Sequence, residues 1–181
     1  MMMSLERALR QLTQRYVDGF QAKTGHAPQS SELYGVASPC VVESRDESVL
    51  WLPRYFDEQR DLHKVEQALE ITLHPSIHQF YASQYAGDIP IRFAGLDLLL
   101  VQVWSEDDFI RLQENLISHL FTQKKLKLAP TAFIATLDSE LEIVSVCNIT
   151  GEVILEEFGS KKRCHLADSL EAFLAQAEVI I

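Results

Sequence analysis

Apolar residues near the start of the chain recur at steps of three and four: Leu5, Leu9, Leu12, Tyr16 and Phe20. This spacing places them on one face of a helix. Ser4 is suited to cap the first turn and Gly25 to end the helix. The pattern therefore predicts an amphipathic helix over residues 4–24, followed by a loop from Gly25 to Pro39.

Two more helices are predicted before the middle of the chain. The first covers Leu62 to Leu73, with apolar residues on one side. His74-Pro75 then restarts the chain, because proline suits a first helical position whose N–H would have no partner. Ile77, Phe80 and Tyr81 continue at helical spacing, and Gly87 is expected to end this run.

The second half of the chain carries two helix-start signals. Ser105 can accept a hydrogen bond from a backbone N–H three residues on, as the first residue of a helix cap does. The acids that follow Ser105 interact favourably with the positive end of a helix. A helix is therefore predicted from Ser105 to about Gln123. A last helix is predicted from Asp168, with Glu171 as the acid of a capping box.

The remaining apolar segments read as strands. A short hairpin is predicted from Cys40–Ser44 and Ser48–Leu52. The strands Ile89–Phe93 and Leu96–Trp104 meet at Gly95, and the near-continuous apolar run of the second predicts a strand covered on both faces. Three strands should form a meander: Thr131–Leu137, Leu141–Asn148 and Glu152–Phe158. These elements predict one α+β domain over residues 1–181, with helices packed on a mainly antiparallel, twisted sheet.

The composition of the 181 residues is that of a soluble globular protein, with 47% hydrophobic and 23% charged residues. No apolar run reaches the roughly 18 residues of a membrane span, and the first residues lack the layout of a secretion signal. Cys40, Cys147 and Cys164 are few and unclustered, which favours reduced thiols. We therefore expect a cytosolic protein.

The formal net charge is −10, from 26 acids and 16 bases. Such a charge disfavours nucleic acid and direct insertion among anionic lipids, and it favours basic partners. The acids are concentrated: residues 131–160 contain six acids and no base, and residues 88–123 contain six acids and two bases. Alternate strand residues share a face, so one continuous acidic face is one interpretation; ordinary solvated charges on separate faces are the other.

No motif for catalysis or for a cofactor stands out. No glycine-rich phosphate loop occurs. His74 and His78 have metal-ligand spacing, but Pro75 replaces the glutamate of a zinc protease motif, which favours capping or packing. Cys40 has no basic neighbour in sequence to activate it, so a buried structural thiol is favoured over a nucleophile. We expect no cofactor, no metal and no catalytic residue.

Three charged clusters have ordinary interpretations. Glu106, Asp107 and Asp108 could chelate a hard cation, but consecutive residues at a helix start point in different directions. Lys124-Lys125-Leu126-Lys127 follows a helix, where lysines favour the negative helix end, and we prefer this interpretation to nucleic-acid binding. Lys161-Lys162-Arg163 is similarly short.

Several stretches resemble the Syd family in order along nearly the whole chain. They include Ser31-Glu32-Leu33-Tyr34-Gly35-Val36, His74-Pro75-Ser76-Ile77-His78-Gln79-Phe80-Tyr81, Trp104-Ser105-Glu106-Asp107-Asp108-Phe109 and Val144-Ser145-Val146-Cys147-Asn148. The resemblance implies an α+β fold of the SUKH superfamily. It also implies a protein that associates with the cytoplasmic face of the bacterial inner membrane through SecY, using an acidic concave surface. Ala37 departs from the family form, which has proline there.

The clustered acids on or beside the predicted sheet are our candidates for partner binding. They are Glu43, Asp46, Glu47, Asp88, Glu106, Asp107, Asp108, Glu140 and Glu142. The expected function is a non-catalytic protein that binds the basic cytosolic loops of SecY and regulates the SecYEG translocase or controls its quality. Two alternatives remain: a SUKH-type immunity protein that neutralises a basic toxin, and a hydrolase that uses Cys40 or a carboxylate–metal site.

Overall fold

The computed structural model describes residues 4–181, and its first helix is the one predicted. This helix, α1, covers Leu5–Thr24. The Ser4 hydroxyl accepts a hydrogen bond of 3.3 Å from the Arg7 backbone N–H, and Gly25 ends the helix in the left-handed region at a φ of 83°. The left-handed backbone explains why glycine follows the last turn.

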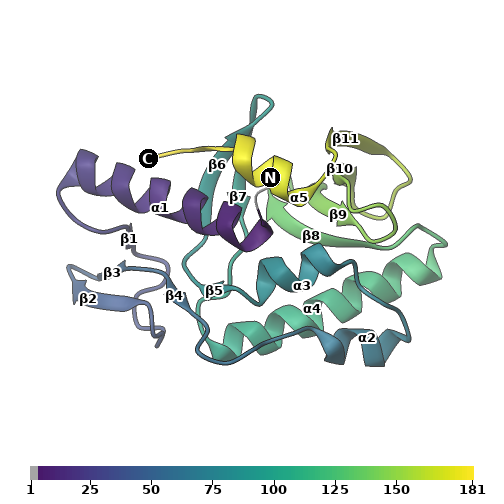
Figure 1. The fold of residues 1–181 in the computed structure, drawn as a ribbon, viewed down its shortest axis with the longest axis horizontal. Coiled ribbons are helices and arrows are strands. Elements are labelled where there is room, and N and C mark those ends of the chain that lie inside the picture. The colour runs from purple at the N-terminus through teal and green to yellow at the C-terminus, as the bar shows by residue number, and fades with distance from the viewer. Residues whose placement is uncertain (1–3) are drawn as a thin grey trace.

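A seven-stranded antiparallel sheet forms the centre of the molecule (Figure 1). Its strands, in spatial order, are β11 (Arg163–Ala167), β10 (Val153–Glu157), β9 (Glu142–Cys147), β8 (Thr131–Thr136), β7 (Leu96–Leu100), β6 (Ile89–Phe93) and β12 (Glu178–Val179). The sheet is curled. The prediction of a single α+β domain with a mainly antiparallel, twisted sheet is confirmed.

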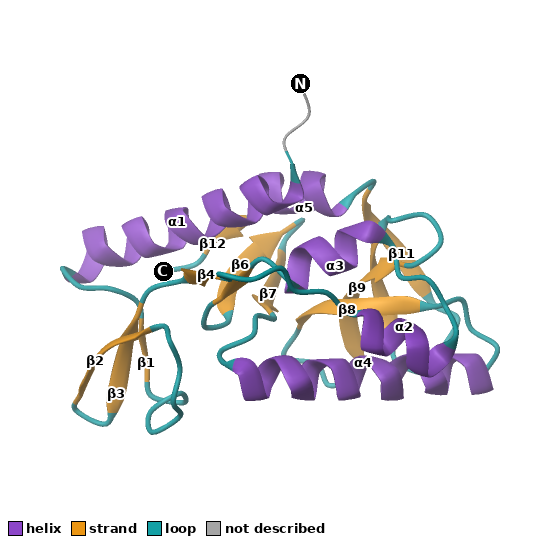
Figure 2. Cartoon of the chain, turned by 60° about the horizontal axis from the view of Figure 1, so that its bottom comes forward, coloured by secondary structure: helices purple, strands orange, loops and turns teal. Residues whose placement is uncertain are grey.

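Helices pack on both faces of this sheet (Figure 2). The helices α1, α3 (Pro75–Tyr81) and α5 (Leu170–Gln176) cover the face that carries Leu98 and Leu100. The helix α4 (Glu106–Lys125), with α2 (His63–Leu69) beside it, lies on the other face, where Gln123 donates a hydrogen bond to Thr131. On β7, Leu98 and Leu100 are buried while Leu99 is 37% exposed. The prediction that this strand is covered on both faces was therefore wrong, and the strand ends at Leu100 rather than Trp104. Its apolar run includes one leucine that faces solvent.

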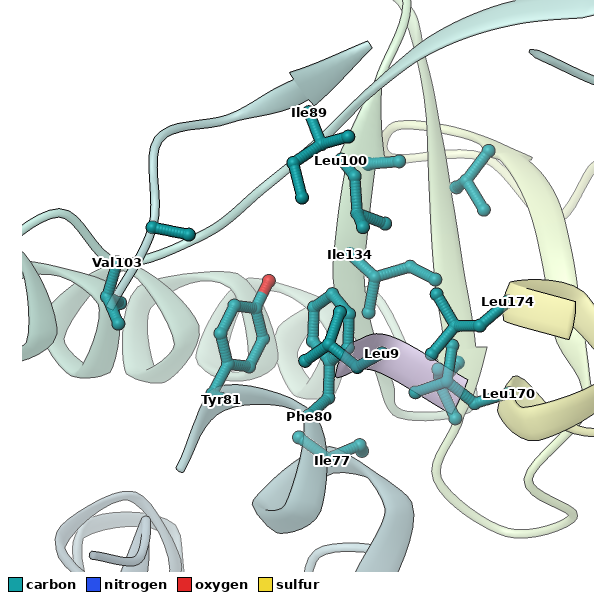
Figure 3. Close-up of a cluster of buried hydrophobic side chains, with 14 of the residues drawn as sticks. Leu9, Ile77, Phe80, Tyr81, Ile89, Leu100, Val103, Ile134, Leu170 and Leu174 are labelled. Carbon is teal, nitrogen blue, oxygen red and sulfur yellow. The ribbon is translucent and has the colours of Figure 1, made fainter. Parts of the chain in front are cut away.

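The core forms where helices from both halves of the chain meet the sheet (Figure 3). Leu9 of α1, Ile77 of α3 and Leu170 of α5 are completely buried against Ile134 of β8. Burying one such side chain contributes roughly 1.5–3 kcal/mol. The core thus fixes the N-terminal and C-terminal helices on the same sheet.

A second, three-stranded sheet extends to one side of the main body (Figure 2). It contains the predicted hairpin, β2 (Val41–Arg45) and β3 (Ser48–Trp51), and adds β1 (Gln29–Ser30) in the order β1-β3-β2. Trp51 at the end of β3 is buried edge-on against Trp104, with ring centroids 6.3 Å apart. This contact joins the small sheet to the start of α4. A separate two-stranded pair joins β4 (Arg54–Tyr55) to β5 (Gln84–Tyr85).

Three predicted boundaries need correction. The helix α2 ends at Leu69, not Leu73, because Glu70 takes a left-handed conformation with a φ of 55°. The helix α3 ends at Tyr81, and β5 occupies the residues before Gly87. Ser169, not Asp168, caps α5, since its hydroxyl accepts the Ala172 N–H at 3.1 Å.

Candidate acidic recess

An open recess of about 290 Å³ lies where five parts of the chain meet. They are the loop of residues 31–39, the turn between β5 and β6, residues 101–104 after β7, the first half of α4, and Phe133 of β8. Its lining includes Leu33, Asp88, Gln102, Trp104 and Asp108. We call this site the acidic recess, because Asp88 and Asp108 face it and Glu32 acts on Asp88 electrostatically.

Asp88 is the most perturbed carboxylate in the recess. Its Oδ1 accepts a hydrogen bond of 3.0 Å from the Gln102 backbone N–H. Desolvation by the surrounding protein raises the pKa of Asp88 to about 6, and the charges of Asp108 and Glu32 act in the same direction against the Gln102 hydrogen bond. The side chain nevertheless remains open to water, which offsets part of this desolvation. Protein atoms surround the Asp88 carboxylate while water still reaches it, as is expected of a side chain in a concave part of the surface.

Asp108 is fixed by the first turn of α4. Its Oδ2 accepts a hydrogen bond from the Trp104 backbone N–H at 3.0 Å, and its Oδ1 accepts one from Arg111 at 2.8 Å. Ser105 caps the helix as predicted, accepting the Asp108 N–H at 3.3 Å. Because the Arg111 side chain is 63% exposed, its ion pair with Asp108 compensates the acidic charge only weakly.

Two hydrogen bonds hold the loop of residues 31–39 against the recess. The Ser38 hydroxyl donates to the Trp104 carbonyl oxygen at 2.6 Å, and the Trp104 indole N–H donates to the Val36 carbonyl oxygen at 3.1 Å. Tyr34 and Val36 on this loop are 49% and 42% exposed. The loop therefore offers apolar contact area in the segment that forms one wall.

The neighbouring acids Glu106 and Asp107 begin α4 but do not line the recess. Glu106 accepts hydrogen bonds from Arg60 at 2.7 Å and from the Tyr85 hydroxyl at 2.8 Å. The Arg60 hydrogen bond, followed by that of Tyr85, lowers the pKa of Glu106. Its charge is thus partly compensated within the chain. Asp107 is exposed at the helix start.

The other five candidate acids lie elsewhere. Glu43 is on β2, the outer edge of the small sheet, and Asp46 and Glu47 form the exposed turn that follows (Figure 2). Glu142 begins β9 opposite Glu157 of β10, and Glu140 precedes it in an exposed loop. The fold brings Asp88 and Asp108 together, but not these five.

Sequence reasoning did not select Glu32. It stands in the predicted loop, within the stretch that resembles the Syd family, and it does not belong to either of the two acid-rich segments. Only the folded loop brings Glu32 near enough to raise the pKa of Asp88. The family-like stretch was the one signal that could have identified it.

A histidine cluster lies away from the recess. Ligand atoms of His63, Glu66 and His78 lie within 4.8 Å of one another. The Nδ1 atom of His78 accepts the Leu62 backbone N–H at 3.0 Å, so its proton belongs on Nε2, 3.3 Å from a Glu66 oxygen. A metal at Nε2 would require the proton to move to Nδ1, facing that N–H. His74, the partner considered from sequence, instead caps α3.

The two less exposed cysteines differ in acidity. Burial raises the pKa of the Cys40 thiol, outweighing the Ser38 hydrogen bond and the nearby Arg54 charge. Burial acts in the same direction on Cys147, but hydrogen bonds from the Thr150 hydroxyl and from backbone N–H groups outweigh it and lower the pKa of that thiol. Cys40 is buried, as favoured from the sequence.

Together these features define a small α+β protein with an open acidic recess beside an apolar loop, and none of the described helices, in residues 4–181, is long and apolar enough to cross a membrane. The chain belongs to the Syd family: the family described as "Syd protein (SUKH-2)" matches residues 6–178. "Protein Syd" of Pectobacterium carotovorum subsp. carotovorum (strain PC1) is 59% identical over 167 residues, covering 92% of each chain. "Protein Syd" of Yersinia pestis (strain Pestoides F) is 55% identical over 172 residues, covering 95% of this chain and 94% of the relative. These names are not those of enzymes.

Proposed function

We propose that this protein binds the basic cytosolic loops of the translocon subunit SecY through the acidic recess, and that it acts as a regulator or quality-control factor of the SecYEG translocase. Membership of the Syd family supports this proposal. The observation that carries it is that Asp88 and Asp108, from two distant segments, line one open recess, with Glu32 of the adjoining loop close enough to act on Asp88 electrostatically.

Electrostatic complementarity accounts for the choice of partner. Cytoplasmic loops of membrane proteins are enriched in lysine and arginine. A recess lined by two acids and one exposed arginine, with a third acid nearby, attracts such loops and accelerates encounter. The proposed protein is non-catalytic, uses no metal or cofactor, does not bind nucleic acid, and sits peripherally on the cytoplasmic side of the inner membrane through SecY.

Charge alone gives modest affinity, so the recess needs apolar contacts as well. An exposed ion pair contributes about 0–1 kcal/mol, which is at most about five-fold in affinity. Tyr34 and Val36 on the adjoining loop supply exposed apolar area, and aromatic side chains often dominate binding energy. A bound SecY loop would place basic side chains at Asp88 and Asp108 and rest its apolar side chains on this loop.

Capture of SecY-containing membranes by the purified full chain tests the proposal. The variant Asp88→Asn/Asp108→Asn removes both charges while leaving amide oxygens that can still accept the Gln102 and Trp104 hydrogen bonds. We expect a loss of roughly 5- to 25-fold in affinity and a weaker dependence on salt. The control Glu43→Gln/Glu142→Gln removes the same charge from outside the recess and should bind as the wild type does.

Three results would contradict the proposal. No capture at all by the folded wild-type chain would exclude SecY as the partner. Equal losses for both double variants would mean that net charge matters and the recess does not. Co-purification of the chain with a basic toxin, and not with SecY, would instead support an immunity protein of the SUKH type.

A further inference from the structure

The two short basic clusters of this acidic chain fold next to each other. Leu126, at the end of α4, lies beside Gly159 in the turn between β10 and β11: its side chain is 4.0 Å from the position of a β-carbon on Gly159. Lys125 and Lys127 flank Leu126, while Lys161 and Lys162 follow Gly159, and all four lysines are exposed. This proximity places lysines from segments more than thirty residues apart on one end of the molecule (Figure 1).

Exposed apolar side chains accompany these lysines. Phe121, Leu126 and Phe158 are 50%, 47% and 54% exposed. The Lys125 ammonium lies 5.2 Å from the centre of the Phe121 ring, and the Phe158 ring lies 6.0 Å from that of buried His119. We call the set Phe121, Lys125, Leu126, Phe158, Lys161 and Lys162 the lysine–phenylalanine surface.

Four acids lie near this surface, one of them buried and one beside Lys162. The Glu156 side chain is buried between the sheet and α4, where it accepts hydrogen bonds from Thr131 of β8 and from Gln123 of α4. Glu157 points to the other face of the sheet, which it shares with Glu142 on β9 and with Lys162, the residue opposite it across the β10–β11 turn. The loop that holds Glu140 adjoins Phe158 through the hydrogen bond from the Phe158 N–H to the Leu141 carbonyl oxygen, so Glu140 lies near the rim of the surface.

Stabilisation of the helix end explains only part of this arrangement. Lysines in the last turn of α4 interact favourably with its negative end. That effect does not extend to Lys161 and Lys162 on another element. It also gives no reason for three large apolar side chains to remain in water at the same place, where each lacks the burial that such side chains usually have.

We propose that the lysine–phenylalanine surface docks directly on an anionic phospholipid bilayer. Lysines reach the headgroup layer while their stems cover apolar surface, and phenylalanine and leucine enter the boundary between headgroups and acyl chains. The positive charge of the lysines is complementary to the negative charge of the lipid headgroups. Each basic residue near an anionic membrane strengthens binding by about five-fold. The contact requires no SecY and is independent of the acidic recess.

The composition of the surface favours lipid over nucleic acid. Its bases are all lysines, and the neighbouring Arg163 is engaged: its guanidinium donates to the Ala129 carbonyl oxygen at 2.7 Å. Arginine, with its planar fork, is the residue that recognises nucleic-acid phosphates best. An aliphatic side chain such as Leu126 gains little from bases but gains from acyl chains. The net charge of −10 also restricts docking to this one end of the molecule.

The location of the surface fits simultaneous binding to lipid and to a membrane protein. It lies at the C-terminal end of α4, whereas the acidic recess lies at the N-terminal end. A helix of 20 residues is about 30 Å long. Acids and bases are thus separated along the molecule, so that an anionic bilayer attracts one end and repels the other.

Sedimentation with vesicles tests the proposal in the absence of SecY. We expect the full chain to bind vesicles of phosphatidylethanolamine and phosphatidylglycerol at low salt, and not vesicles of pure phosphatidylcholine. The variant Lys125→Gln/Lys161→Gln/Lys162→Gln should lose on the order of 100-fold in vesicle affinity. The control Arg7→Gln/Arg45→Gln/Lys64→Gln makes the same change in net charge at exposed sites outside the surface, and it should keep wild-type binding.

The apolar contribution is tested separately. Phe121→Ser removes an exposed ring and should weaken vesicle binding without changing thermal stability. A polyglutamate peptide and a single-stranded oligonucleotide serve as competing anions that lack acyl chains. The proposal is overturned if the folded wild type does not bind anionic vesicles, or if both triple variants bind equally. It is equally overturned if Phe121→Ser retains full vesicle binding and the protein binds the two soluble anions as tightly as it binds anionic vesicles.

Discussion

The Ser38 hydroxyl donates a hydrogen bond of 2.6 Å to the carbonyl oxygen of Trp104, 66 residues further along the chain. The bond joins the loop of residues 31–39 to the residue that precedes α4. Trp104 returns a hydrogen bond from its indole N–H to Val36 in the same loop. The geometry of the acidic recess therefore depends on one serine and one tryptophan at its wall.

Removing the Ser38 hydroxyl should loosen this wall. Ser38→Ala leaves the partly buried Trp104 carbonyl oxygen without its donor, which costs about 1 kcal/mol in the free energy of unfolding. We expect faster amide hydrogen exchange in residues 31–39 and weaker capture of SecY. The exposed Ser44 of β2 provides the control, since Ser44→Ala should change neither property. Unchanged exchange in Ser38→Ala would show that the loop is held by other contacts.

Protonation of Asp88 should make both stability and partner binding depend on pH. Its folded-state pKa of about 6 lies above its ordinary value of 3.8, so the folded chain binds the proton more tightly than the unfolded chain. Stability from this residue is therefore highest at low pH and falls as pH rises between these two values. Binding of a basic partner follows the opposite course, because the carboxylate loses its charge as pH falls through about 6.

Asp88→Asn should flatten both dependences, and urea unfolding and membrane capture at several pH values measure them. Asp107→Asn is the matched control, because it removes the same charge from an exposed position at the start of α4, outside the recess. This variant should keep the wild-type pH dependence. If Asp88→Asn keeps the wild-type dependence of stability and capture on pH, another group is responsible for that dependence.

Thiol labelling should separate the two less exposed cysteines. Cys40 is 1% exposed and burial raises its pKa, so alkylation in the native state should be slow. Hydrogen bonds from Thr150 lower the pKa of Cys147, which favours its reactive thiolate. In a Cys164→Ser background, Thr150→Ala should therefore shift the pH midpoint of Cys147 labelling upward. Rapid modification of Cys40 would reopen the case for a nucleophile in this protein.

Local signals explain why much of the fold was predictable from sequence. Helix ends were correct where one side chain or turn decides them, as at Ser4, Gly25, Pro75 and Ser105. The start of α5 was misplaced because Asp168 and Ser169 are both good capping residues and only the folded backbone distinguishes them. Short strands such as β1 and β12 exist through pairing with distant partners, which no local pattern reveals.

The acidic recess was predictable only in part for the same reason. Asp88 and Asp108 were selected as acids in acid-rich segments, and the fold brings them together. Counting charges could not exclude Glu140 or include Glu32, because the first depends on how the sheet curls and the second on how a loop packs. The two lysine clusters show the limit most clearly: each is ordinary by itself, and only the Leu126–Gly159 contact makes them one surface.

A buried polar network between α4 and the sheet gives a test of stability. Glu156 is 2% exposed and accepts a hydrogen bond of 2.6 Å from the Thr131 hydroxyl. That hydroxyl in turn accepts from Gln123 at 2.6 Å and lies 3.2 Å from the Nε2 atom of His119. A buried carboxylate is tolerated only with such partners. Thr131→Val removes the hydroxyl at nearly constant volume and leaves several polar groups unsatisfied.

We expect Thr131→Val to lower the free energy of unfolding by about 1–3 kcal/mol, measured by urea denaturation. Thr136→Val is the matched control: it makes the same substitution on the same strand, but at an exposed position, and should change stability by less than about 0.5 kcal/mol. Because β branching is retained in both variants, strand propensity cancels in the comparison. Equal effects at the two positions would mean that the network around Glu156 contributes nothing to stability beyond its packing.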